Sequence, residues 1–354
     1  MIKYIGSKRT LVPVLGAMAR AVRARTAVDL FSGTTRVAQE FKRHGIAVTA
    51  VDVATYTEAL ARCFIATDAT QIDHQRLRSA VDELAGLPGE HGYFTETFCE
   101  RARYLQPKNG MRVDAIRNAI EKTYAGTPLY SILLTALLLA ADRVDSTTGL
   151  QMAYLKQWSP RSYKDLELRV PDLLPGAGTA IRADAIEVVA TLPKVDLAYV
   201  DPPYNQHRYF TNYHVWETLV RWDAPEHYGV ACKRIDSRDL ATKSVFNRRR
   251  EMPAALRDVL TRVSAHLVVV SYNDESWVTP EQIAGWLREA GHREVRTLDF
   301  DSKRYVGAQI GIHDPQGRKV GAVSHLRNTE HLVVAGEPEA VGAAVSASCG
   351  AWAR

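Results

Sequence analysis

The sequence VDLAYVDPPY, residues 195–204, sets a polar loop directly after a short apolar run. The run from Val195 to Val200 has the length and the β-branched residues that are typical of a buried strand. Asp201, two prolines and Tyr204 would therefore stand just past the carboxyl end of that strand. Because open α/β sheets bind ligands at this edge, the stretch predicts an open α/β fold with a site at the loop.

The four loop residues, Asp201, Pro202, Pro203 and Tyr204, suit methyl transfer to an amine on an aromatic base. Such an amine is a poor nucleophile because its lone pair is delocalised into the ring. The carboxylate of Asp201 and the carbonyl of Pro202 can accept its two hydrogens and draw the nitrogen toward tetrahedral geometry. The prolines stiffen the loop and remove competing N–H groups, and Tyr204 can stack on the base, at about 1–3 kcal/mol. A structural turn is the alternative, because Asp-Pro commonly opens turns.

A loop near the start of the sequence is predicted to hold the methyl donor, for which S-adenosylmethionine is the usual choice. A strand-like run at residues 26–31 is followed by Gly33 and by a helical stretch at 36–44. Gly33 lets the backbone approach a ligand closely, and the start of the helix offers unpaired N–H groups. Asp29 can pair with the ammonium group of the donor. The lack of G-x-G-x-x-G after this strand argues against a dinucleotide dehydrogenase.

Three further positions complete the predicted donor site. Asp52 ends the next strand, Ala47–Asp52, where its carboxylate can accept both ribose hydroxyls. Lys8 can meet the carboxylate of the donor, with a solvated lysine as the alternative. Asp184 can contact the adenine ring or can cap the helix that follows it. The residues expected to contact the donor are Tyr4, Gly6, Lys8, Asp29, Phe31, Ser32, Gly33, Asp52 and Asp184.

Length and composition limit the class of protein. With 354 residues, 46% of them hydrophobic, the chain can bury a substantial core, and a net charge of +5 permits binding to nucleic acid. The four cysteines lie far apart without a C-x-x-C pair, which favours reduced thiols and predicts no metal site. The most apolar run, Leu129–Ala141, is too short to span a bilayer, and no signal peptide is evident. A cytoplasmic protein without a membrane anchor is therefore expected.

A change of pattern divides the chain into domains. Strands and helices alternate over residues 1–70 and again over 179–335, which predicts one catalytic domain in two segments. Residues 71–178 are mostly helical and are expected to form an insertion. Its helices are expected at 76–84, 113–124 and 129–144. Residues 336–354 are rich in Ala, Gly and Ser and are expected to be a disordered tail.

The motifs taken together resemble those of DNA adenine-N6 methyltransferases of the Dam-like class, in the alpha-type order. That order is Lys3–Lys8, then Asp29–Gly33, then a long insertion, then Asp201–Tyr204. Within the class, the chain looks most similar to modification methylases associated with FokI-type restriction systems. The likeness reaches about residue 335 through Asn205, Arg208, Tyr209, Asn212–His214, Glu217, Ser271–Asn273, Lys303–Tyr305 and Glu330–Val333.

The resemblance implies a class I methyltransferase fold, which is Rossmann-like and has a seven-stranded mixed sheet with helices on both faces. It implies S-adenosylmethionine as cofactor, double-stranded DNA as substrate and target recognition by the helical insertion. It also implies that the adenine leaves the duplex before reaction, since an amine inside the stack cannot be reached. A restriction-modification setting, with a separately encoded endonuclease as partner, follows from the same likeness.

Two basic regions are expected at the DNA. The insertion interleaves basic and aromatic residues, which suits phosphates and exposed bases, although a helical cap with an aromatic core is the alternative. The tract 233–250 holds seven Lys and Arg residues and is interpreted as a DNA clamp, with a solvated charged loop as the alternative. The insertion set is Arg101, Arg103, Lys108, Arg112 and Arg117 with Tyr93, Phe94, Phe98 and Tyr104. The residues proposed to touch DNA near the site are Arg208, Tyr209, Asn212, His214, Lys243, Arg248, Arg249 and Arg250.

Two other functions fit the same residues. The first is a methyltransferase acting on cytosine N4, on RNA adenine or on a protein amide; by family resemblance, Asp at the first loop position favours adenine. The second is a DNA-binding protein that has lost catalysis, and the presence of Asp29, Asp52 and Asp201 argues against it.

Overall fold

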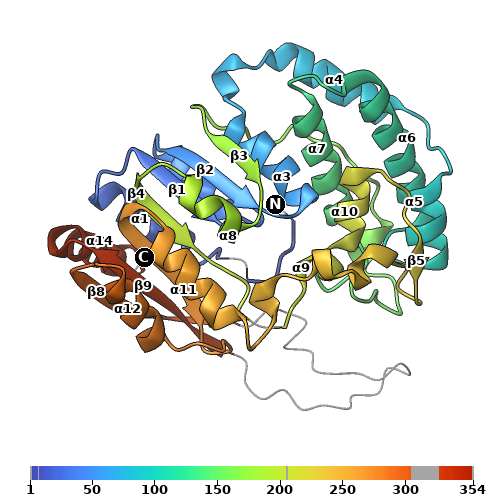
Figure 1. Ribbon diagram of the computed structural model, residues 1–354. Coiled ribbons are helices and arrows are strands. Elements are labelled where there is room, and N and C mark those ends of the chain that lie inside the picture. Colours follow the sequence, from blue (N-terminus) through green and yellow to red (C-terminus); the bar gives the residue numbers. More distant parts are fainter. Residues whose placement is uncertain (1, 7, 205, 304–326, 353–354) are drawn as a thin grey trace. The chain divides into compact units, whose positions relative to one another are not determined.

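The computed structural model describes residues 2–6, 8–204, 206–303 and 327–352, and Figure 1 labels its elements. The chain divides into two compact units. The helical unit comprises Met1–Tyr4, Ala54–Ala180 and Arg208–Lys243. The sheet unit comprises Ile5–Val53, Ile181–His207 and Ser244–Arg354. The helical unit thus includes residues before the predicted start at residue 71. It also includes a second segment after the loop formed by residues 201–204, which is called the catalytic loop below.

Seven strands form one mixed sheet, as predicted, and their order is β3-β2-β1-β4-β7-β9-β8. The strands are β1 Thr26–Leu30, β2 Ala47–Asp52, β3 Thr179–Arg182, β4 Val195–Val200, β7 Ala265–Asn273, β8 Glu294–Lys303 and β9 Arg327–Gly336. β1 is parallel to β2 and β4, and β4 is parallel to β7. β9 is antiparallel to both β7 and β8, which makes the sheet mixed.

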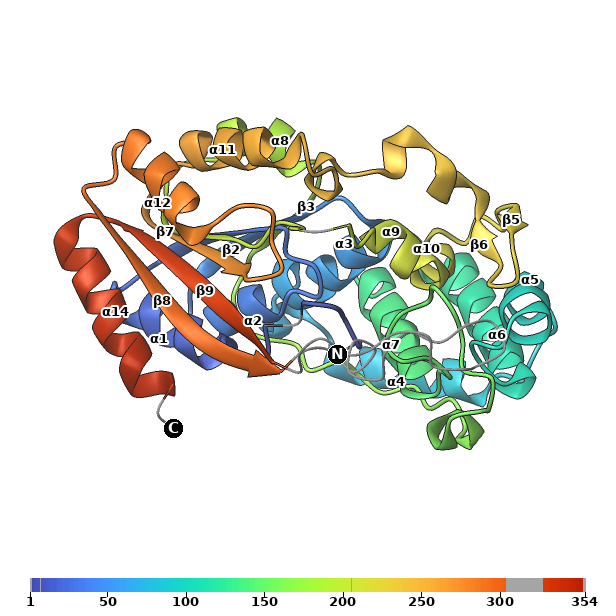
Figure 2. The same ribbon diagram turned by 90° about the horizontal axis from the view of Figure 1, so that it is seen from below.

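Helices cover both faces of this sheet, as Figure 2 shows. One face carries α1 Val12–Ala21, α2 Arg36–Arg43 and α14 Pro338–Trp352, and the other carries α8 Ala185–Val188, α11 Met252–Arg262 and α12 Pro280–Glu289. Leu256 of α11 and Leu287 of α12 pack in one buried cluster with Val200 and Val270 of the sheet. Burial on both faces explains why the central strands are continuous apolar runs.

The residues after 336 form helix α14, so the prediction of a disordered tail is wrong. Val341, Ala344 and Ser348 recur at helical spacing and are buried, and α14 packs against α1 and against β8 and β9. The ring of Trp352 meets that of Phe300 edge-on, with centroids 4.9 Å apart. Alanine favours the helix and small side chains allow close packing, which the low-complexity composition concealed.

The helical unit contains the expected insertion helices. Its α-helices and strands are α3 Thr55–Ala61, α4 His74–Gly86, α5 Tyr93–Thr95, α6 Pro107–Tyr124, α7 Tyr130–Arg143, α9 Tyr209–Asn212, α10 His214–Arg221, β5 His227–Tyr228 and β6 Lys233–Arg234. Short turns of helix lie at η1 Arg62–Ala66, η2 Ala69–Gln71, η3 Glu96–Arg101, η4 Pro160–Tyr163, η6 Ile235–Arg238 and η7 Leu240–Thr242, and in the sheet unit at η5 Val189–Thr191 and η8 Val245–Asn247. Asp73 caps α4 by accepting the N–H groups of Gln75 and Arg76.

Candidate active site

The parallel strands bring two predicted site residues to one edge of the sheet. In register, Leu30 of β1 pairs with Val51 of β2 and with Val200 of β4. Asp52 and Asp201, the next residues of β2 and of the chain after β4, therefore stand at the same level. This is the carboxyl edge at which the sequence predicted a site.

Asp201 belongs to a lysine–carboxylate cluster formed by Lys8, Asp201 and Glu330. The Lys8 Nζ lies 3.2 Å from Asp201 Oδ1 and 2.9 Å from Glu330 Oε2. Lys8 is 6% exposed, so these contacts are made out of bulk water. Lys8 was expected to meet the carboxylate of the donor; in this structure two protein carboxylates occupy that place beside its ammonium.

Burial and neighbouring charge set the protonation of this cluster. Burial raises the pKa of Asp201 to about 6; Lys8 opposes this rise and Glu330 adds to it. Burial acts to lower the pKa of Lys8, but the charges of Asp201 and Glu330 prevail and hold that pKa well above its usual value. At neutral pH Lys8 is therefore protonated and Asp201 is mostly ionised.

Tyr204 is fixed by two residues of β7. The side-chain amide of Asn273 donates to the Tyr204 hydroxyl at 2.9 Å, and the Tyr272 ring meets the Tyr204 ring edge-on at 5.3 Å. The Lys8 Nζ lies 5.5 Å from the centroid of the same ring. Tyr204 is only 7% exposed, so neighbouring residues cover most of its surface.

The loop after β1 holds three residues in the left-handed region. Phe31 has φ 69°, Gly33 φ 49° and Thr35 φ 62°. A β-branched residue such as Thr35 rarely adopts this conformation, and such strain is concentrated at ligand-binding segments. The N–H of Gly33 donates to Asp52 Oδ2 at 2.9 Å, which ties the loop to the end of β2.

Two polar side chains in this region have a buried atom without a hydrogen-bond partner among the described residues. These atoms are Asp29 Oδ1 and Ser32 Oγ. Asp29 Oδ2 accepts the N–H of Ala38 at 3.1 Å, so half of this carboxylate is satisfied. Burial, and then the charge of Asp201, raises the pKa of Asp29 well above its usual value. A cationic group beside Oδ1 would give this oxygen a partner and would lower the pKa of Asp29.

The other residues predicted to contact the donor lie in different parts of the structure. Asp184 caps α8, with Oδ1 accepting an N–H of that helix at 2.9 Å, which confirms the capping alternative. Gly6 has φ 71°, a conformation that a side chain would strain. Tyr4 lies in the helical unit, where its ring stacks on Tyr209 and Tyr213 with centroids 5.2 and 4.7 Å away. The structure therefore groups Asp29, Gly33 and Asp52 with the catalytic loop in the sheet unit, and Tyr4 with the helical unit.

Two residues expected at the DNA are buried inside the helical unit, so those predictions are wrong. His214 has no exposed surface, and its Nε2 lies 3.0 Å from the backbone oxygen of Gln151. Burial lowers the pKa of His214 to about 3, so the ring is neutral and has no charge to attract a phosphate. Asn212 is 4% exposed. By contrast, Arg208 is exposed, and its DNA contact stays a prediction.

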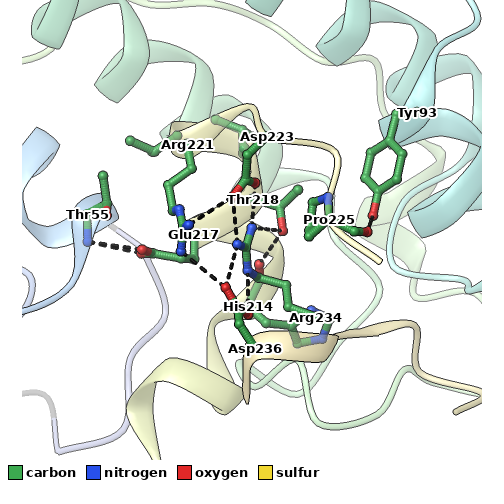
Figure 3. A network of polar contacts seen from close by, with 12 residues as sticks. Thr55, Tyr93, His214, Glu217, Thr218, Arg221, Asp223, Pro225, Arg234 and Asp236 are labelled. Atoms are coloured by element: carbon green, nitrogen blue, oxygen red, sulfur yellow. Dashed lines mark hydrogen bonds and ion pairs between the residues drawn. The ribbon is translucent and has the colours of Figure 1, made fainter. Parts of the chain in front are cut away.

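The tract 233–250 contains one buried arginine, Arg234, and Figure 3 shows its polar contacts. The Arg234 side chain is 1% exposed and forms two parallel bonds with Asp223, at 2.6 and 2.7 Å. It also pairs with Asp236 at 2.8 Å and donates to the Thr218 hydroxyl at 3.2 Å. Asp223 and Asp236 are both anionic, so Arg234 stabilises the helical unit and cannot serve a DNA clamp.

Other basic residues of that tract keep accessible charge. Arg249 and Arg250 are exposed, and Lys243 is half-buried. Arg248 is half-buried and pairs with Glu251 at 2.8 Å. DNA contact by these four residues remains a prediction.

Several aromatic residues of the insertion form its core. Phe94, Phe98 and Tyr104 are each at most 1% exposed, as is Arg117. The Arg117 guanidinium donates to the backbone oxygen of Leu219 at 2.9 Å. For the three aromatic residues the helical-cap alternative, with an aromatic core, is therefore correct, whereas Arg117 is buried and not solvated as that alternative expected. Arg103 instead lies over the Trp158 ring at 4.7 Å.

Two residues of the site were not assigned roles from the sequence. Glu330 and Asn273 lie in segments that matched the family pattern, but a polar residue near the end of a strand gives no sign of its partner on another strand. The antiparallel pairing of Asn273 with Glu330 brings them together. Asn205, Arg304 and Tyr305, which also belonged to that pattern, lie outside the described residues.

In the described part of the chain, no three His, Cys, Asp or Glu side chains converge on a common point. In the same residues, every helix is too short or too polar to cross a membrane.

Comparison with known proteins places these features in a family. Residues 4–284 match the family described as D12 class N6 adenine-specific DNA methyltransferase. Modification methylase StsI of Streptococcus sanguinis is 29% identical over 81% of this chain and 46% of that protein. Type II methyltransferase M.FokI of Planomicrobium okeanokoites is 27% identical over 82% of this chain and 47% of its own length. Type II methyltransferase M.NlaIII of Neisseria lactamica is 26% identical over 80% of this chain and 86% of its own. The chain therefore spans about half the length of the first two relatives.

Proposed function

Because the chain belongs to the D12 class N6 adenine-specific DNA methyltransferase family, we propose that it methylates N6 of adenine in double-stranded DNA. The observation that carries this proposal is the position of the Asp201 carboxylate at the carboxyl edge of the sheet, where the Lys8 ammonium lies 3.2 Å from it. An ionised carboxylate accepts a hydrogen from the amine and stabilises the positive charge that grows on its nitrogen during transfer.

The sheet unit offers groups that fit S-adenosylmethionine as the donor. The unpaired Oδ1 of buried Asp29 suits the donor's ammonium group, and Asp52 at the end of β2 suits the ribose hydroxyls. Gly33 holds the loop between them in a conformation that brings backbone close to a ligand. When bound, this cofactor supplies an electrophilic methyl group on a sulfonium centre.

The catalytic loop orients the acceptor. Asp201 and the Pro202 carbonyl each accept one hydrogen of the adenine amine, and Tyr204 presents its ring to the extruded base. With the donor bound, these groups would hold N6 in place to accept its methyl group, and the electron pair of the broken carbon–sulfur bond would stay on sulfur. The methylated nitrogen is then acidic, and Asp201, with a pKa of about 6, can take its proton and pass it to water.

The names of the relatives extend the proposal to a biological setting. Modification methylases and type II methyltransferases are among the proteins most similar to this chain. We therefore propose that this protein marks a specific DNA sequence, as the modification half of a restriction-modification system with a separate endonuclease.

Sequencing of DNA from cells that express the protein tests this function. Long-read sequencing should show N6-methyladenine in one sequence context with the wild-type protein and none with Asp201→Asn. A mark on cytosine, or on RNA adenine with unmarked DNA, would transfer the proposal to the corresponding alternative. Absence of any mark, together with purified protein that binds duplex DNA, would favour a binding protein without catalysis.

The exposed pair Arg249 and Arg250 gives a prediction about DNA affinity. Changing both to alanine is expected to weaken binding across all duplex sequences and to lower the salt dependence by about 0.9 per lost phosphate contact. Binding isotherms at several salt concentrations measure this slope. Arg257→Ala is the matched control, because that arginine lies on α11 and pairs with Glu289 at 2.8 Å. Equal slopes for wild type and the double variant would remove this pair from the DNA surface.

A further inference from the structure

Glu330 is a charged residue at the site for which the proposed reaction supplies no task. It lies on β9, in register with Asn273 of β7 and Phe300 of β8. Its Oε2 lies 2.9 Å from Lys8 Nζ, closer than the 3.2 Å that separates this nitrogen from Asp201. A carboxylate near an anionic catalytic group raises the energy of both, so its presence requires a physical reason.

We propose that Glu330 is a positioning residue for Asp201 and acts by sharing Lys8, an inference that rests on the proposed function. Lys8 is nearly fully buried between the two carboxylates, and its ammonium has three hydrogens to donate. With Glu330 in place, Lys8 holds Asp201 without being its exclusive partner. Without Glu330, the buried ammonium has Asp201 as its remaining carboxylate, and a tighter pair draws Asp201 away from the adenine amine.

A second connection runs from Glu330 to the aromatic residue of the loop. The side-chain amide of Asn273 donates to the Tyr204 hydroxyl at 2.9 Å and lies 3.5 Å from Glu330 Oε1. Glu330 thus contacts groups that hold the first and last residues of the catalytic loop. One side chain on β9 can therefore fix the loop at both ends.

The charges that surround Asp201 give this inference a distinctive signature. Asp201 is influenced by Lys8, Glu330 and Tyr199, and it in turn raises the pKa of Asp29. Among these groups Glu330 is the anion that shares the lysine with Asp201. Removing its charge should lower the pKa of Asp201, because one repulsion disappears and Lys8 is left to Asp201.

The test compares Glu330→Gln with Asp299→Asn, a matched control on the neighbouring strand β8. Asp299 is exposed and pairs with His331 at 2.8 Å, so its change removes a carboxylate from the same sheet outside the cluster. For Glu330→Gln we expect kcat for DNA methylation to fall on the order of 10-fold and the acid limb of its pH profile to move to lower pH. Titration of the Asp201 carboxyl carbon by NMR, assigned with Asp201→Asn, should show the same downward move without any substrate. Asp299→Asn should leave both readouts unchanged.

Each outcome decides one of the two proposals. An unmoved Asp201 titration in Glu330→Gln overturns the positioning inference, whether or not DNA is methylated. If the Asp201 titration moves in Glu330→Gln but the wild-type protein methylates no DNA, the coupling stands and the proposed function is overturned. Glu330→Asp guards against a folding defect: it keeps the charge, so it should restore the Asp201 titration and part of the kcat. Loss of activity without recovery in Glu330→Asp, with an unmoved titration, would assign Glu330 a structural role only.

Discussion

Replacing Asp201 with asparagine is expected to lower kcat for adenine methylation on the order of 10³-fold. Asparagine keeps the shape of the side chain, but it offers one acceptor oxygen in place of two and no charge for the positive nitrogen of the transition state. Single-turnover transfer of labelled methyl groups to duplex DNA, with saturating donor, measures this loss directly. The loss should persist at every pH, because no titration restores the missing charge.

The control for this change must separate chemistry from binding and folding. Asp196 lies on the same strand β4, and its carboxylate accepts the N–H groups of Arg25 and Thr26 at 2.8 and 3.0 Å. Asp196→Asn therefore removes a carboxylate from the opposite end of the strand, and we expect its kcat to match wild type. Asp201→Asn should bind DNA and S-adenosylhomocysteine as wild type does. A kcat close to wild type in Asp201→Asn would contradict the proposed mechanism.

Replacing Asp29 with asparagine is expected to weaken cofactor binding by roughly 30-fold or more, since losing one partner of a buried charge pair costs about 2–5 kcal/mol. The reason is the unpaired Oδ1, which asparagine cannot present as an anion to an ammonium group. Calorimetric titration with S-adenosylhomocysteine, which keeps that ammonium group, measures the change. Asp196→Asn again serves as control, with unchanged affinity expected. Equal affinity in Asp29→Asn would remove this carboxylate from the cofactor site.

Asp29→Asn should also raise the stability of the protein without cofactor near neutral pH. Burial raises the folded-state pKa of Asp29 well above 3.8, so the fold favours the protonated carboxyl. The stabilisation from this group is complete below pH 3.8 and is lost as pH rises through the folded-state pKa. The variant lacks this loss, so its advantage in thermal unfolding at neutral pH should shrink as pH falls toward 4. Asp196 has a lowered pKa, and its loss should have the opposite sign at neutral pH.

The sequence predicted the sheet and its edge well because these depend on local signals. The strands at 26–30, 47–52 and 195–200 are short runs of β-branched and apolar residues that are buried on both faces. The site residues Asp52 and Asp201 follow such runs directly, so the strand end fixes where they stand. The position of a residue relative to its own strand can therefore be predicted from the residues next to it in the sequence.

The predictions that were wrong or missing depend on contacts between segments that are distant in the sequence. Helix α10 reads as a polar and aromatic segment beside the catalytic loop, yet residues 214–220 are all buried. Its Glu217 accepts the N–H groups that open α3, at 3.0 Å for Thr55 and 3.3 Å for Tyr56. Its polar side chains therefore have partners inside the helical unit, which local composition cannot reveal. The same holds for Glu330, whose function depends on a residue 322 positions away.

The antiparallel strand β9 has a consequence for the order in which the protein matures. It lies between β7 and β8, and β8 reaches the sheet only through it. About nine-tenths of this sequence is synthesised before β9. Lys8 therefore cannot contact Glu330 until β9 has been synthesised. Closing a contact between such distant residues is slow relative to the local pairing of β1 and β2. The contact between Lys8 and Glu330 is therefore expected to form later than the pairing of β1 with β2.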